Sequence, residues 1–72
     1  MPEPEMQMVS SSSIEAVGYD AENGEIYVRF LEGDTYVYSE ADQGTFEGLL
    51  HAESVGSHLN RVIKGNFPYN KL

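Results

Sequence analysis

The chain has 72 residues, no cysteine and a formal net charge of −8 at pH 7. This length fits one small domain, and the lack of cysteine excludes a disulfide framework and a thiolate metal site. No apolar run approaches the roughly 20 residues of a membrane span, so we expect no membrane partner and a cytoplasmic location. The acidic balance also disfavours general attraction to nucleic acid.

The chain begins with MPEPEMQ, residues 1–7, where two prolines remove backbone donors and the glutamates add nothing to a core. We expect a flexible tail there, followed by a single domain over residues 8–72. The serines at 10–13 lead into the first predicted strand. The three predicted strands, by their apolar, β-branched and aromatic content, are residues 14–19, 25–30 and 34–39.

The loop between the last two strands decides which side chains share a face. A three-residue loop, Leu31-Glu32-Gly33 with Gly33 in the left-handed conformation, is our prediction. It gathers apolar side chains on one face and leaves Tyr27, Arg29, Thr35 and Val37 on the other, against water. That apolar face comprises Ile26, Val28, Phe30, Tyr36 and Tyr38.

A two-residue loop, Glu32-Gly33, is the alternative. It would place Tyr36 and Tyr38 beside Tyr27 and Arg29, as on a base-stacking platform. Under the favoured register, both YxY rings are expected to be mostly buried and structural. Their expected contacts are Leu49, Leu59 or Ile63.

From Ser39 the pattern changes to helical spacing. Asp42 is the expected N-cap of a first helix, whose stripe is Phe46, Leu49 and Leu50. A break at 53–56 follows, and Ser54 or Ser57 caps a second helix that runs through Lys64 and ends at Gly65. Its expected buried stripe is Leu59, Val62 and Ile63, and Gly56 is expected at a close-packed or positive-φ position in the turn.

These elements predict an α+β fold. Its sheet is a three-stranded antiparallel meander, packed on one face by two short C-terminal helices, with no strand after residue 42.

No catalytic or cofactor motif is present. His51 and His58 are seven residues apart without the spacing of a zinc motif, and the serines lack histidine and aspartate partners in a nucleophile motif. We therefore expect a protein that is not an enzyme and that holds no metal or cofactor.

The charges are distributed unevenly along the chain. Residues 1–48 hold eleven acids and one base, giving −10, whereas residues 49–72 hold one acid and three bases, giving +2. Arg61 and Lys64 are three residues apart on the second predicted helix, so both should project from one side. We predict a binding surface formed by His58, Asn60, Arg61, Lys64, Tyr69 and Lys71. The alternative is that these cations simply pair with acids such as Glu47 and Glu53.

Several short motifs occur together in order: MVSSSSI, GYD, IYVRF, YVY at 36–38, FEGLLHAESVGSHLN and IKGNFPYNKL. In this order they resemble the KTSC domain family, and Ala52, Ser54, Gly56 and Asn60 match its A-x-S-x-G-x-x-x-N spacing. The resembling stretch is residues 8–72. The family occurs alone in bacteria and phages and at the C-terminus of some lysyl-tRNA synthetases, a fusion that implies RNA binding.

Two functions follow as hypotheses. The first is a small binding module that contacts RNA or DNA weakly, and in a salt-sensitive way, through its second helix and C-terminal tail. The alternative is a phage-encoded, acidic protein-interaction module. Its sheet and turns would bind a basic protein surface and compete with nucleic acid there. Either would act as a monomer or weak homodimer.

Overall fold

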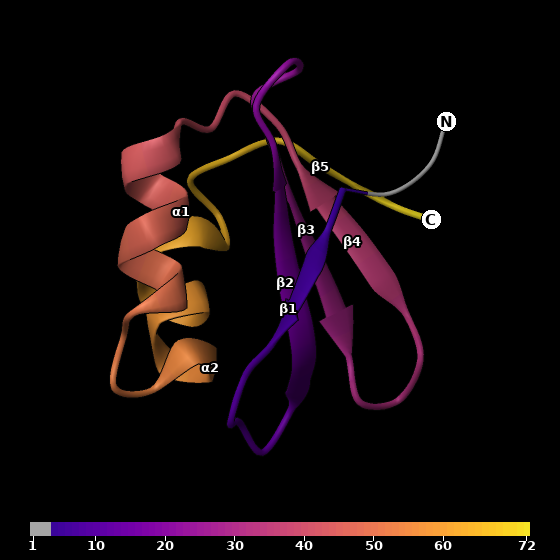
Figure 1. The fold of residues 1–72 in the computed structure, drawn as a ribbon, viewed down its shortest axis with the longest axis vertical. Helices are drawn as coiled ribbons and strands as arrows, with labels where there is room; N and C mark the ends of the chain where they lie inside the picture. Colours follow the sequence, from indigo (N-terminus) through magenta and orange to yellow (C-terminus); the bar gives the residue numbers. More distant parts are fainter. Residues whose placement is uncertain (1–3) are drawn as a thin grey trace.

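The computed structural model describes residues 4–72 and shows one layer of strands with helices on a single side (Figure 1). Five antiparallel strands follow one another in chain order across the sheet. The strands are β1 (Met6–Met8), β2 (Ile14–Asp20), β3 (Glu25–Phe30), β4 (Thr35–Tyr38) and β5 (Tyr69–Lys71). Between β4 and β5 come α1 (Gln43–Leu50), α2 (Val55–His58) and the π-helical turn η1 (Leu59–Ile63).

The predicted α+β class with an antiparallel sheet and two short helices is confirmed, but the strand count is wrong. β1 and β5 are short edge strands whose pairing partners are β2 and β4. After η1 the chain crosses back from the helix side and lies beside β4 (Figure 1). The expected absence of strands after residue 42 is therefore wrong, and Met6 and Gln7, expected in the tail, belong to β1. The first three residues of that expected tail lie outside the described residues.

The predicted register of the β3–β4 hairpin is confirmed. Tyr38 lies opposite Ile26, and Tyr36 lies opposite Val28. The Phe30 N–H donates to the Asp34 carbonyl at 2.8 Å, which closes a three-residue loop. Gly33 has a φ of 116°, which a residue with a side chain rarely adopts. This register points Tyr36 and Tyr38 toward the helices.

On the sheet face without helices, large side chains stand beside small ones. The pairing sets Tyr27 between Gly18 and Val37, and it sets Arg29 between Ala16 and Thr35. Thr35 and Val37, expected against water, are in fact only 8% and 5% exposed. Large neighbours on adjacent strands account for this burial, because cross-strand side chains lie within contact distance of one another.

Gly18 also marks the docking of β1. It pairs with Met6, and a Cβ at Gly18 would lie 2.7 Å from the Met6 sulfur and 2.8 Å from the Glu5 carbonyl oxygen. A side chain there would displace the edge strand, so the glycine permits close approach of two backbones.

The core lies between the sheet and the helices. Leu59 and Ile63 are buried as predicted, but Val62 is 38% exposed. The Lys64 N–H donates to the Leu59 carbonyl at 2.7 Å, five residues back, so this turn is wider than an α-helical turn. This wider turn rotates Val62 away from the sheet. The buried core cluster is Ile14, Val17, Ile26, Val28, Tyr38, Phe46, Leu49, Val55, Leu59 and Ile63.

Each helix has the N-cap that the sequence indicated. The Asp42 carboxylate accepts from the backbone N–H and the hydroxyl of Thr45, both at 2.8 Å. The Ser54 hydroxyl accepts from the Ser57 N–H at 3.3 Å. These caps separate two helices rather than one continuous helix. Among residues 4–72, no helix has the length and apolar character that a membrane crossing requires.

Candidate functional site

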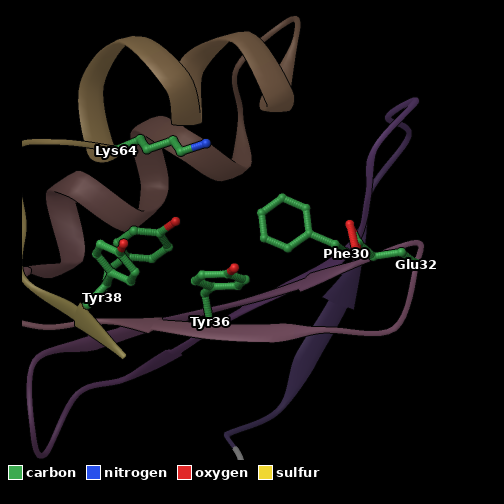
Figure 2. Close-up of a pocket in the computed structure, with 6 residues that line it drawn as sticks. Phe30, Glu32, Tyr36, Tyr38 and Lys64 are labelled. Carbon is green, nitrogen blue, oxygen red and sulfur yellow. The ribbon is translucent and has the colours of Figure 1, made fainter. Parts of the chain in front are cut away.

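A groove of about 330 Å³ opens between the β4–β5 edge and the end of the helical segment (Figure 2). We call it the tyrosine groove. Tyr69 enters it because β5 pairs with β4, which sets Tyr69 directly opposite Tyr38. Three rings from two distant parts of the chain therefore meet at one place. The lining residues are Phe30, Glu32, Tyr36, Tyr38, Lys64 and Tyr69.

The rings of the groove pack against one another at aromatic contact distances. Tyr69 lies 5.7 Å from Tyr36 and 5.8 Å from Tyr38 between ring centroids, and Tyr36 and Tyr38 are 6.5 Å apart. Phe30 meets Tyr36 edge to face, at 5.5 Å and 86°. Such offset and edge-to-face arrangements suit the ring quadrupoles.

The tyrosines differ in their access to solvent. Tyr38 is only 2% exposed and forms part of the core, whereas Tyr69 is 57% exposed at the rim. Tyr36 is half-buried between them. Burial raises the pKa of the Tyr38 phenol above its ordinary value of 10.0, and Tyr36 and Tyr69 add to the rise. The expected burial of the YxY pair is thus confirmed for Tyr38 and partial for Tyr36.

The groove carries one charge of each sign. Lys64 extends from the end of the helical segment over the rings, with its ammonium above the groove, and Glu32 lies in the loop beyond Phe30 (Figure 2). Both charged side chains are exposed. The π turn positions Lys64, because the N–H of this residue closes the turn. Within residues 4–72, neither Lys64 nor Arg61 forms an ion pair with an acid.

The predicted binding surface is divided by the structure. Lys64 and Tyr69 meet in the tyrosine groove, and Arg61 is exposed on η1. Lys71 instead pairs with Asp34, at 3.4 Å between Nζ and Oδ2. His58 was expected to point largely outward, but it is half-buried, and its ring lies 3.7 Å from where a Cβ at Gly48 would stand. Helix packing therefore accounts for His58.

Asn60 belongs to a second hollow, of about 310 Å³, which we call the serine basin. Its walls are the β1–β2 loop, residues 10–13, and the start of α2, residues 53–57, together with Asn60. The Ser11 hydroxyl accepts from the N–H groups of Ser13 and Ile14, both at 3.2 Å.

Gly56 permits the close packing of this basin. A Cβ at Gly56 would lie 3.2 Å from the Ser13 hydroxyl and 3.5 Å from that of Ser11. The expectation of close packing at Gly56 is confirmed, although the residue lies in the first turn of α2 and has no positive φ.

Phe30 and Glu32 complete the groove but were not in the predicted site. The three-residue loop could have indicated both residues. Its register puts Phe30 on the same sheet face as Tyr36 and leaves Glu32 next to that face. Over residues 4–72, no group of three histidine, aspartate or glutamate side chains gathers as a metal site requires.

Comparisons with known proteins agree on one family. The family model of the KTSC domain matches residues 10–67. A protein of Tsukamurella paurometabola is 45% identical over 62 residues, which are 86% of this chain and 92% of that protein. A lysine–tRNA ligase of Nostoc punctiforme is 31% identical over 61 residues, which are 85% of this chain but 11% of the ligase.

The fold agrees with a solved structure as well. The crystal structure of a KTSC domain protein from Yersinia pestis superposes with a TM-score of 0.88 at 35% identity, covering 94% of this chain and 96% of that one. Sequence and fold together therefore show that the chain belongs to the KTSC domain family.

Proposed function

We propose that the protein is a small, non-enzymatic module that binds single-stranded nucleic acid, RNA in particular, by taking an unpaired base into the tyrosine groove. One observation carries the proposal. Three tyrosine rings meet beneath a lysine that has no acid partner among residues 4–72. Unpaired bases stack on exposed rings at about 1–3 kcal/mol per base, and a neighbouring cation meets the phosphate.

The remaining charges make this binding weak and sensitive to salt. Arg61 and Lys64 are the exposed cations of the helical segment, while Lys71 is engaged by Asp34. So few phosphate contacts give weak binding that added salt weakens further, and the formal charge of −8 opposes non-specific binding. Recognition then depends on stacking rather than on a broad basic surface.

A relative supports RNA over DNA. The matching stretch forms 11% of a lysine–tRNA ligase, so a domain that is 31% identical is part of a protein whose name includes an RNA substrate. A base-stacking groove would suit the unpaired segments of such a molecule, because sequence-specific RNA recognition mostly targets unpaired bases.

Titration of fluorescent RNA and DNA oligonucleotides at low and physiological salt tests the proposal. Tyr69→Ala should weaken binding at least about fivefold, the lower end of what one stacked base contributes. Met8→Ala is the matched control, because Met8 is an exposed residue of the other edge strand. Lys64→Gln should weaken binding more than Lys71→Gln, whose charge is already paired. Wild-type protein that binds no oligonucleotide even at low salt would remove this proposal.

A second candidate function rests on the exposed acids. Glu22, Glu40, Glu47 and Glu53 all have exposed side chains, which present negative charge to solvent. Such a surface would attract a basic protein and would compete with nucleic acid for it. Capture of one basic protein from host lysate, unchanged by nuclease and abolished at high salt, would favour this function over the first.

A further inference from the structure

The tyrosine groove is dipolar as well as aromatic. Lys64 supplies an ammonium from the helix side, and Glu32 supplies a carboxylate from the β3–β4 loop. The rings of Phe30 and Tyr36, 5.5 Å apart between centroids, line the same groove. A complementary ligand has a flat ring for the centre, a negative group for Lys64 and a hydrogen-bond donor for Glu32.

The size of the groove limits that ligand to one small ring system. A volume of about 330 Å³ is near the lower end of the range for small-molecule pockets, which is about 300–1,000 Å³. The buried Tyr38 ring forms the floor of the groove, and the exposed Tyr69 ring forms its rim. One base with its phosphate suits this space better than a stack of bases.

Glu32 then distinguishes among bases. An ionised carboxylate only accepts hydrogen bonds, and carboxylates accept from the exocyclic amino group of cytosine. Uracil presents a carbonyl oxygen at the same position, which a carboxylate repels. Building on the proposed function, we propose that the groove selects an unpaired base bearing an exocyclic amino group, with cytosine preferred over uracil.

Cytosine and uracil make the sharpest comparison because they have the same ring size and shape. Stacking and phosphate contacts are therefore matched, and the difference in affinity reports the contact with Glu32. Glu32→Gln removes the negative charge but keeps a side chain that both donates and accepts, so it should accommodate either base. Glu22→Gln is the matched control: it removes the same charge from the exposed β2–β3 turn, and Glu22 does not line the groove.

The experiment titrates oligocytidylate and oligouridylate of equal length into wild type, Glu32→Gln and Glu22→Gln at one low salt concentration. Wild type and Glu22→Gln should prefer oligocytidylate by about fivefold, the lower end of one specific base contact. Glu32→Gln should bind oligouridylate more tightly and bring the ratio close to one.

The outcomes separate this inference from the proposed function. Equal binding of both oligonucleotides by wild type, or a cytidine preference that persists in Glu32→Gln, overturns the base selection while leaving nucleic-acid binding intact. Failure of wild type to bind either oligonucleotide overturns both. A loss of preference in Glu22→Gln would mean that net charge, and not Glu32, sets the ratio.

Discussion

The tyrosine groove and the serine basin are hollows of similar volume, about 330 and 310 Å³, built from opposite kinds of side chain. The groove has aromatic rings and a charge of each sign. The basin has hydroxyl groups, one amide and the carboxylate of Glu53. They share no lining residue, although Asn60 and Lys64 are only four residues apart in sequence.

This difference shows that proximity along a helix does not define a site. Asn60 faces the β1–β2 loop, whereas Lys64, after the π turn, faces the rings of β4 and β5. The basin is held together by close packing at Gly56 and by hydrogen bonds within its own loop. We therefore expect the basin to be structural and the groove to bind, and four predictions test that division.

The largest effect is expected inside the groove. Tyr38→Ala should lower the free energy of unfolding by about 3 kcal/mol or more, because it empties a buried aromatic position. Tyr69→Ala should lower it by less than about 1 kcal/mol, because that ring is mostly exposed. Urea denaturation measures both values. Equal losses would mean that Tyr69 is a core residue and not an available stacking surface.

The next largest effect is expected at Ser54, which caps α2 and lines the serine basin. Ser54→Ala should lower the free energy of unfolding by about 1 kcal/mol, because the Ser57 N–H loses its acceptor. Oligonucleotide affinity should not change, since Ser54 does not line the groove. Denaturation and titration of the same sample check both expectations. A variant that folds normally but loses affinity would assign binding to the basin.

Glycine substitutions give a smaller and more specific comparison. Gly44 and Gly56 each occupy the second position of a helix. Gly44→Ala should raise the free energy of unfolding by up to about 1 kcal/mol, because its Cβ meets only the Asp42 carboxylate at 3.6 Å. Gly56→Ala should raise the free energy of unfolding by less, because its Cβ would lie 3.2 Å from the Ser13 hydroxyl.

Thermal or urea denaturation of both alanine variants gives the comparison. Adding Ser13→Ala to Gly56→Ala removes that hydroxyl and should recover the difference. Equal gains from the two single substitutions would show that the basin is loosely packed.

The smallest expected effect appears at alkaline pH. The pKa of Tyr38 is raised in the folded protein, so its contribution to stability is complete below about pH 10, the ordinary value. It is lost as the pH rises from there through the raised value, because the unfolded chain ionises first. Comparing wild type with Tyr38→Phe by denaturation from pH 8 to pH 11, as an approximate range, should show a steeper alkaline loss in wild type. Parallel curves would mean that the phenol is not effectively buried.

The local features of the fold could be predicted from the sequence. The loop at Gly33, the cap at Asp42 and the burial of Tyr38 each depend on nearby residues, and all three are observed. The edge strands could not be predicted in this way, because MQM and YNK carry no strand pattern and gain their conformation from pairing with β2 and β4. Gly18 was the available signal, since an isolated glycine in a strand indicates close backbone approach.

The candidate site was predicted only in part for related reasons. Lys64 and Tyr69 were expected at a binding surface, but their partners Phe30 and Glu32 come from the distant end of β3 and the loop that follows it. The rotation of Val62 away from the core depends on a π turn, which the helical period of the sequence does not reveal. Lys71 was assigned to the basic surface because of its sequence position, whereas strand pairing brings it to Asp34.

The pairing of Tyr38 with Tyr69 has a consequence for how ligands can be detected. These residues flank both helices, so the groove closes only when the intervening chain has folded and β5 has reached β4. Contacts between such distant segments form slowly, because they carry the entropy of closing a long loop. A ligand of the groove therefore binds the native state and not the unfolded chain. It should raise the melting temperature of the whole domain in proportion to the logarithm of its concentration, which makes thermal shift a screen for the natural partner.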